Sequence, residues 1–338
     1  MIKKALNLLM LVAAISLPAP EALSYPGVQP PTSSMTPASD ALSFLPQSDA
    51  IALVDVRKLF RETVPRIFAG DAAKLAQVNS EIDKFKSRTG VDLRSFDRVV
   101  LGMRYTYPSP TITKIETLVI AHGAFDLKAL TAAEKLATQG KYREEKYRGM
   151  TISIINVNDQ IKLLGLWNVR LGELAICALD ANTLAFGALP NVRSAIDAGR
   201  RGSNANQGLA ALASRDPNAV IGFGTNVTGA LMKNLNVGND AIAKDVNSIR
   251  QVYGSIGTSE AEVALFLAAR TDSPEAAKSV SETVTGLKQL GAIVIVRLAP
   301  PKRALAQTAL DNLKITTRGS EVEVRTQFAA ASLASFVK

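Results

Sequence analysis

The sequence predicts an α+β fold: two similar halves, each a mixed, mainly antiparallel sheet packed with helices in the manner of split βαβ repeats. The β-branched runs Val99–Leu101 and Thr117–Ile120 flank a proline-containing turn, and Asp126 is placed to cap the helix that follows. The same order of strand, strand and helix returns between Ile249 and Val280. Because the chain has 338 residues and is 47% hydrophobic, it can bury the cores of two ordinary domains.

The N-terminus has the layout of a secretory signal. Two lysines precede an uncharged apolar run, and Ala22 and Ser24 are the small residues of a signal-peptidase site. We therefore expect residues 1–24 to be a signal peptide cleaved after Ser24, and residues 25–44 to be a Pro/Ser/Thr-rich linker. The alternative is an uncleaved anchor, but the run is short for a membrane span. The expected location is extracytoplasmic, periplasmic or secreted, with no integral membrane span after cleavage.

The first α+β half, residues 45–199, should open with a buried strand at residues 50–56. A helix from Arg57 should stop or kink at Pro65, because proline lacks the amide proton that a helix interior needs. Asp71 should cap the next helix. That helix has an amphipathic pattern, and its apolar face carries Leu75, Val78, Ile82 and Phe85.

Two hairpins are expected after the central strand pair of the first half. One should turn at Arg148-Gly149 and the other at residues 180–182, since both places combine turn residues with flanking apolar strands. Pro190 should occupy the first position of a helix. Residues 159–172 interrupt the pattern, and we interpret them as an insertion.

Residues 200–208 are rich in Gly, Asn and Ser and predict a linker to the second α+β half, residues 209–338. In this half Ser273 should cap a long helix. The run at residues 291–298 fits a strand by its β-branched residues, but we favour a continuation of the helix. A hairpin around Gly319-Ser320 and a short terminal helix should close the chain. The expected buried stripe of the long helix consists of Val280, Val284 and Leu287.

Three segments carry a resemblance to known proteins. They are LPQSDAIALVDVRKLF, TGVDLRSFDRVVLG and LDNLKITTRGSEVEVRTQF, and the likeness spans most of residues 41–338. With these segments the chain resembles exported bacterial proteins of unknown function with a duplicated α+β domain. The resemblance implies an extracytoplasmic bacterial protein, and it implies no catalytic residues.

Chemistry-bearing residues are scarce. The chain has one histidine, His122, and one cysteine, Cys177, and the strand context of each favours a structural role. No nucleophile motif or metal-ligand spacing occurs. Residues 254–257 have the wrong spacing for such a motif, and we interpret them as a turn between strands. Residues 222–224 match only part of a nucleotide loop. The remaining catalytic candidate is a carboxylate pair formed by Asp55 and Asp97. We therefore expect no cofactor and no metal, and we expect that the protein is not an enzyme.

Two segments are candidates for binding. The first is a basic and aromatic hairpin edge that includes Tyr142, Arg143 and Tyr147; charges that protect an edge strand are the alternative explanation. The second joins the only tryptophan, Trp167, to aliphatic residues, Lys162 and Arg170. It predicts either a surface patch for a lipid or partner, or an ordinary buried insertion.

The function we favour is that of an exported, non-enzymatic binding or interaction protein of the bacterial cell envelope. Its expected partner is an envelope protein or an anionic or lipid ligand, because the formal net charge of +9 falls only to about +8 when the signal peptide is removed. An exported protein is not expected to bind nucleic acid. The alternative function is a secreted hydrolase with an unrecognised carboxylate-based site.

Overall fold

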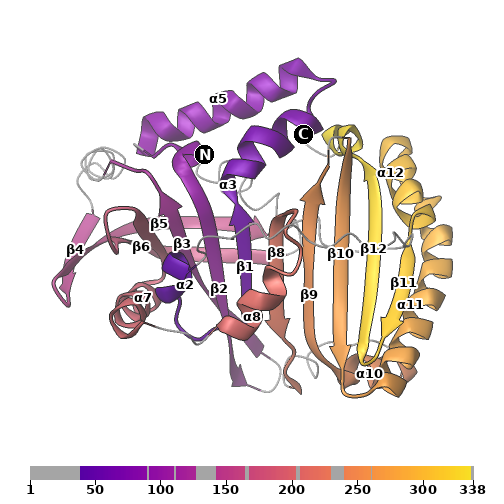
Figure 1. Cartoon of the computed structure of the whole chain (residues 1–338). Coiled ribbons are helices and arrows are strands. Elements are labelled where there is room, and N and C mark those ends of the chain that lie inside the picture. The colour runs from indigo at the N-terminus through magenta and orange to yellow at the C-terminus, as the bar shows by residue number, and fades with distance from the viewer. Residues whose placement is uncertain are drawn as a thin grey trace.

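A single sheet forms the centre of the molecule (Figure 1). The computed structural model describes residues 39–89, 91–109, 112–126, 142–163, 167–202, 206–229, 240–259 and 261–335. Within these ranges the sheet has 12 strands in the order β11-β12-β10-β9-β8-β1-β2-β3-β7-β6-β5-β4, and each pairing is antiparallel. The predicted α+β class and mainly antiparallel sheet are therefore confirmed.

The strands fall into two runs along the chain. The first run comprises β1 (Ala50–Asp55), β2 (Phe96–Ser109), β3 (Ile112–Gly123), β4 (Tyr142–Tyr147), β5 (Met150–Leu163), β6 (Trp167–Ala178) and β7 (Thr183–Gly187). The second run comprises β8 (Ala219–Asn226), β9 (Ile249–Thr258), β10 (Glu262–Thr271), β11 (Lys314–Arg318) and β12 (Glu321–Ala329).

Helices precede, separate and follow these strands. In the first part of the chain they are α2 (Ser39–Ser43), α3 (Val56–Lys58), the π-helical turn η1 (Leu59–Thr63), α4 (Val64–Ile67), α5 (Ala72–Thr89), η2 (Leu93–Ser95) and α7 (Leu189–Arg201). In the second part they are α8 (Gln207–Ala213), α10 (Asp240–Ser248), α11 (Pro274–Ile295), α12 (Pro300–Asp311) and the 3-10 helix η3 (Ala330–Ser335).

The two runs of strands meet at the middle of the sheet. There β1 pairs with β8 in a register that sets Ala50 opposite Thr225. Outward from this pair the order β2-β3-β7-β6 on one side corresponds to β9-β10-β12-β11 on the other, and β5 and β4 extend only the first side. A shared hydrogen-bond ladder therefore joins the halves. Helix α7 continues to Arg201 and α8 begins at Gln207, inside the stretch expected to be a linker.

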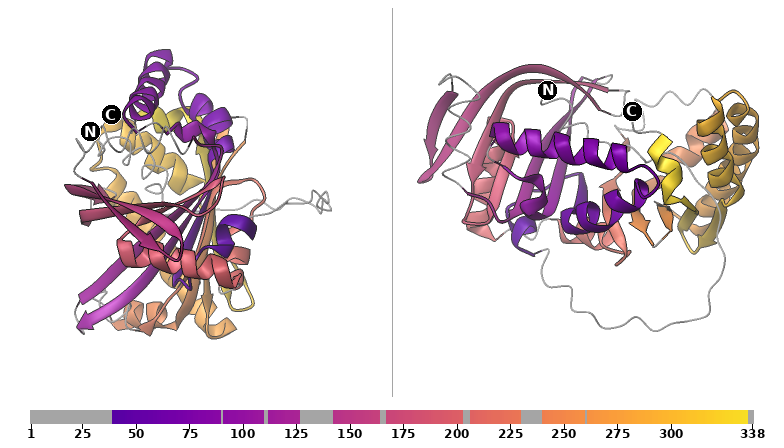
Figure 2. Two further views of the ribbon diagram at one scale, coloured as in Figure 1. Left: turned by 90° about the vertical axis from the view of Figure 1, so that its left-hand side faces the viewer. Right: turned by 90° about the horizontal axis from the view of Figure 1, so that it is seen from above.

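Helices cover both faces of the sheet. On the face toward the viewer in Figure 1, α2, α7 and α8 pack over the centre and the first half, around a core that includes Ile51, Val100 and Ile196. On the opposite face, α3 to α5 cover the first half, where Val56 and Val99 are buried. Helices α11 and α12 cover the second half on that same face, and Figure 2 shows them gathered at the far end of the molecule from β4.

Local sequence signals explain the helix boundaries. Asp71 caps α5, because its carboxylate accepts a hydrogen bond from the Lys74 amide at 3.0 Å, and the face with Val78 and Ile82 is buried as expected. Pro65 does not end the helical segment. The π-helical turn η1 lies just before it, so the chain loses the regular hydrogen-bond pattern there and continues as α4 to Ile67.

The predicted hairpins are present. Arg148 and Gly149 have φ angles of 50° and 85°, as a two-residue turn with left-handed residues requires. In the β6–β7 turn the Asn182 amide donates a hydrogen bond to the Asp180 carboxylate at 2.8 Å. The hairpin of β11 and β12 turns at Gly319, whose φ is 57°. These turns depend on neighbouring residues only, which is why the sequence predicts them well.

Two expectations about strands need correction. Residues 159–172, interpreted as an insertion, lie mainly in the extended strands β5 and β6, whose pairing sets Leu163 opposite Trp167. Residues 254–257, interpreted as a turn, lie inside β9. The glycine-rich residues 222–224 are in β8, where a Cβ on Gly222 would lie 1.8 Å from the Ala213 carbonyl oxygen. Glycine is needed there so that α8 can approach the sheet. This close packing explains the glycine that made the sequence resemble part of a nucleotide loop.

Other expectations fall outside the described residues. The signal peptide and most of the linker lie within residues 1–38, and the helix expected after Asp126 would begin at residue 127. The run at residues 291–298 is described, and it is helical as favoured, because α11 extends to Ile295.

Candidate interaction surface

The hairpin edge predicted to bind a partner is tied to α7 by its own side chains. The Tyr147 hydroxyl donates a hydrogen bond to the Asp197 carboxylate at 2.9 Å, and Arg148 Nε lies 2.6 Å from the other oxygen of that carboxylate. Arg193 donates two hydrogen bonds to Glu145, at 2.8 and 2.6 Å. We call these five residues the hairpin–α7 cluster.

The electrostatics of the hairpin–α7 cluster are internally balanced. The guanidinium groups of Arg148 and Arg193 lie 5.7 and 5.6 Å from the centre of the Tyr147 ring. The hydrogen bond from Tyr147, together with the charge of Arg148, holds the pKa of Asp197 below its ordinary value. Tyr147 is therefore used to attach the hairpin to α7.

The other predicted binding residues are distributed along the same sheet edge. Arg143 is exposed, and its guanidinium lies 3.4 Å from a Glu173 carboxylate oxygen. Lys162 lies in β5, and Trp167 and Arg170 lie in β6. In the pairing of these two strands Gln160 is opposite Arg170. The side chains of these three residues and of Tyr142 lie outside what the structure describes, so their predicted role stays a prediction.

The residues considered for catalysis have structural partners. His122 Nδ1 lies 3.2 Å from the hydroxyl of the buried Thr183. Cys177 is buried, and burial raises the pKa of its thiol to about 11. Asp55 caps α3 by accepting a hydrogen bond from the Lys58 amide, whereas Asp97 pairs with Arg57 at 3.0 Å. In the described ranges no group of three His, Cys, Asp or Glu residues is arranged to hold a metal ion.

A second charged cluster covers the sheet face opposite α11. Arg215 and Arg325 lie 3.5 and 3.1 Å from the carboxylate of Glu323, which is only 2% exposed. Arg270 pairs with Glu321 at 2.6 Å, and Arg215 reaches the same residue at 3.1 Å. In this cluster the carboxylates of Glu321 and Glu323 are each paired with guanidinium groups.

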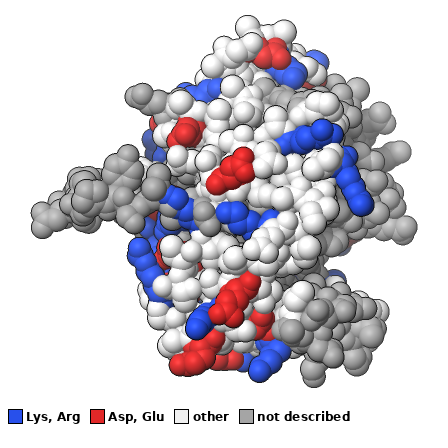
Figure 3. All heavy atoms as spheres, turned by 90° about the vertical axis from the view of Figure 1, so that its right-hand side faces the viewer, with Lys and Arg blue, Asp and Glu red and all other residues white. Residues whose placement is uncertain are grey.

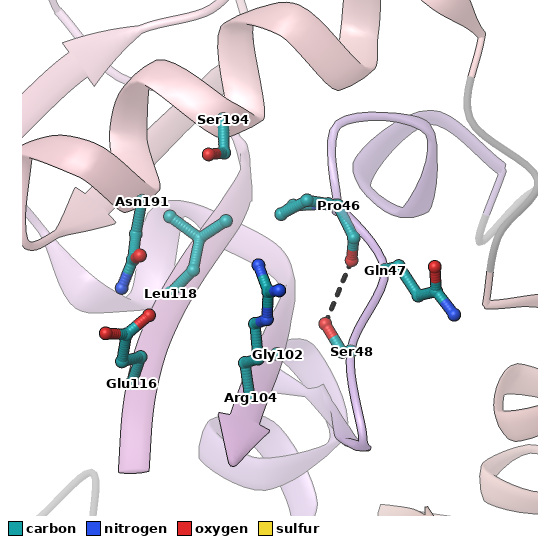
Figure 4. A pocket seen from close by; sticks show the side chains of 9 residues that line it. All are labelled: Pro46, Gln47, Ser48, Gly102, Arg104, Glu116, Leu118, Asn191 and Ser194. Carbon is teal, nitrogen blue, oxygen red and sulfur yellow. Dashed lines mark hydrogen bonds between the residues drawn. The ribbon is translucent and has the colours of Figure 1, made fainter. Parts of the chain in front are cut away.

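A small polar hollow lies beside the middle of β2 and β3 (Figure 4). Most of its polar groups already have partners: Ser194 Oγ donates to the Pro190 carbonyl and Asn191 Nδ2 to the Thr117 carbonyl. The Arg104 guanidinium points into the hollow near Glu116. The hollow is lined by Pro46, Gln47, Ser48, Gly102, Arg104, Glu116, Leu118, Asn191 and Ser194.

The most unusual surface is the C-terminal part of α11. At the start of this helix, Ala277 and Val280 are buried against Val322 and Val324 of β12. Ser273 caps the helix, as predicted, by accepting a hydrogen bond from the Ala276 amide. Beyond Val284 most of the large apolar side chains are exposed to solvent. Five of them are between 49% and 63% exposed, namely Leu287, Leu290, Ile293, Val294 and Val296, and we call this group the α11 end.

The exposure of Leu287 corrects the expected buried stripe. The helix is held in place by other contacts: Lys288 Nζ donates a hydrogen bond to the Leu313 carbonyl at 3.0 Å, and Ile295 is buried. At the beginning of α12, the Arg303 guanidinium donates to the Leu298 carbonyl. The α11 end is therefore an anchored helical surface with apolar side chains that contact solvent.

A signal for this surface is present in the sequence. After Val284, apolar residues follow at spacings that place them around most of the helix circumference, which is wider than one buried stripe. No acidic residue occurs between Thr283 and Leu310. Sequence reasoning assigned Leu287 to the buried stripe because hydrophobic residues in a helix usually face the core.

The fold places the chain among α+β proteins built on one open antiparallel sheet. It is similar to crystal form IV of TP0453, with a TM-score of 0.45 and 11% identity over 89% of this chain and 97% of that chain. Crystal form III of TP0453 gives a TM-score of 0.43 and 10% identity over 87% and 96%. At such identities the likeness describes the fold alone. No family model and no curated protein matches the chain.

Proposed function

We propose that this chain is an exported, non-enzymatic binding protein of the bacterial cell envelope and that the α11 end is its contact surface. The observation that carries the proposal is the set of five exposed aliphatic side chains on one anchored helix end. Contiguous apolar surface is unfavourable in water at about 25 cal/mol per Å², so its presence on a folded chain marks a contact site.

Two further observations support this choice of surface. The hairpin–α7 cluster directs the aromatic and charged groups of Tyr147, Arg148 and Arg193 toward each other. The apolar side chains of the α11 end are instead between 49% and 63% exposed. Export is proposed from the signal-like N-terminus, and cleavage after Ser24 is tested by mass spectrometry of the exported protein. Retention of the N-terminal residues in the mature protein would contradict it.

The hydrolase alternative rests on a carboxylate site, and no observation favours it among the described residues. Asp55 and Asp97 were its candidates, and each is engaged with a different partner. A hydrolytic site that uses a side-chain hydroxyl as its nucleophile also needs a base placed next to it. The hydroxyl next to His122 belongs to the buried Thr183, at a strand pairing inside the sheet.

The proposal is tested by site-specific photo-cross-linking in the envelope of a bacterium that exports the full chain. A photo-reactive residue is placed at position 293 on the α11 end, and at position 79 on the exposed side of α5 as the matched control. We expect adducts from position 293 and few from position 79. Equal or absent adducts at both positions would contradict the assignment of the α11 end as the contact surface.

A further inference from the structure

We infer that the α11 end docks on the surface of an anionic phospholipid membrane. This inference rests on the proposed function and names the partner of the same surface. It follows from the shape of the apolar surface and from the charges around it.

The apolar surface has the geometry of an interfacial helix. Within the described part of the chain, no helix is both long and apolar enough to cross a membrane. The exposed aliphatic residues of this surface lie in the last turns of α11 and at its C-cap, Val296, and helical spacing distributes Leu287, Leu290, Ile293 and Val296 over about half of the helix circumference. Such a convex end suits the boundary between lipid headgroups and acyl chains, which surrounds an inserted helix on several sides.

The charges near the α11 end have one sign. Residues 283–310 contain Lys288, Arg297, Lys302 and Arg303 and no Asp or Glu. Arg297, Lys302 and Arg303 are exposed. A basic rim around an apolar helix surface is the combination that binds anionic lipids, because the headgroup charge attracts the cations while the aliphatic groups leave water.

Acidic residues of α11 lie at its other end. Glu275 and Glu282 are both in the first three turns of the helix, before the apolar residues begin. Figure 3 looks onto the side of the molecule formed by α11 and α12, and its largest group of Asp and Glu atoms lies toward the lower end of the view. The separation gives α11 a direction, because along this helix the exposed apolar groups and the nearby basic groups lie at the C-terminal end.

The same charges argue against a second copy of this chain as the occupant. In a symmetric dimer each patch meets its own copy, so the Arg297, Lys302 and Arg303 groups of two chains would approach one another. Like charges at an interface lower its stability. A membrane surface with anionic headgroups has the opposite charge and needs no matching pocket.

The test is co-sedimentation of the mature chain with vesicles of phosphatidylcholine alone and of phosphatidylcholine mixed with phosphatidylglycerol. We expect strong binding only to the vesicles with phosphatidylglycerol, and weaker binding at about 1 M salt than at about 0.1 M, since salt screens the headgroup charge. Val294→Asp should weaken binding at least about tenfold, because one aliphatic contact is lost and a negative charge is added. The double variant Arg297→Glu/Lys302→Glu should weaken it about thirtyfold or more.

A charge-matched control separates this surface from the hairpin edge. Arg143→Glu/Lys146→Glu changes the net charge by the same amount on β4 and should leave vesicle binding within about twofold. Thermal unfolding of each variant shows whether it is folded, and Val294→Ser replaces Val294→Asp if the latter is not. Absence of binding to both vesicles, or an equal loss in the hairpin variant, would overturn the lipid inference.

The outcomes for the proposed function and for the lipid inference are distinguishable. Cross-linking from position 293 in cells without vesicle binding would leave the contact surface in place and exclude the lipid as its partner. A dimer in light scattering that Val294→Asp dissociates, without vesicle binding, would identify a second copy as the occupant and overturn the lipid inference.

Discussion

The β4–β5 hairpin and the α11 end show how partners within the chain decide which surface is left for binding. The hairpin carries the aromatic and basic residues that are typical of binding sites, but Tyr147 and Arg148 contact Asp197, and Glu145 contacts Arg193. The α11 end carries aliphatic residues that are typical of a core, but they are exposed. Residue type alone therefore does not show which side chains are engaged within the chain.

The largest expected effect is on the free energy of unfolding, and it distinguishes the two parts of α11 when a valine in each part is replaced by aspartate. Val280→Asp should lower the free energy of unfolding by about 3–5 kcal/mol, because Val280 is 6% exposed and the new carboxylate would be buried without a partner. Val294→Asp should change it by no more than about 0.5 kcal/mol, since Val294 is 60% exposed. Urea unfolding followed by circular dichroism measures both, and similar losses in the two variants would show that the α11 end is buried.

A smaller effect is expected at the hairpin. Tyr147→Phe removes the hydroxyl that donates to Asp197 and should lower the free energy of unfolding by about 1 kcal/mol. The same variant should bind vesicles as the unchanged chain does, because its contacts lie within the hairpin–α7 cluster. Unchanged stability together with impaired vesicle binding would reverse the roles assigned to the two regions.

The hairpin–α7 cluster should also respond to pH. The hydrogen bond from Tyr147 and the charge of Arg148 hold the pKa of Asp197 below its ordinary value of 3.8. Folding therefore favours the charged carboxylate, and this stabilisation is present above pH 3.8 and is lost as the pH falls through the lowered pKa. Asp197→Asn should make unfolding less sensitive to pH in that acid range. An identical pH profile in the variant would contradict the role of this carboxylate.

The smallest effect is expected at Cys177. Burial raises the pKa of its thiol to about 11, so at pH near 8 little thiolate forms and the side chain is covered. A thiol reagent should modify it slowly in the folded protein and rapidly in urea. Rapid reaction in the folded protein would mean that this part of β6 is accessible.

Local interactions explain which parts of the fold could be predicted. The caps at Asp71 and Ser273 and the turns at Arg148-Gly149 and Gly319 depend on residues a few positions apart. The joining of both halves through the β1–β8 pair depends on contacts between distant residues, and no local pattern specifies it. The α11 end was missed for a related reason: the burial of a helix depends on the strands that cover it.

The corresponding strand orders on the two sides of the β1–β8 pair support an internal duplication, which we propose from them. In this proposal β1-β2-β3-β7-β6 and β8-β9-β10-β12-β11 are equivalent, and the β4–β5 hairpin was added to the first half. An experimental structure tests it by superposition of the two strand sets. Different strand connectivity in the two sets would contradict the duplication.

The most direct measurement of the central claim places a polarity-sensitive fluorophore on the α11 end. Ile293→Cys is labelled in a Cys177→Ala background, and Asn79→Cys in the same background is the control, since both positions are exposed. On addition of vesicles with phosphatidylglycerol, the label at position 293 should shift to shorter wavelength and become protected from aqueous quenchers, while the label at position 79 should not change. An unchanged spectrum at position 293, or the same shift at both positions, would contradict docking through the α11 end.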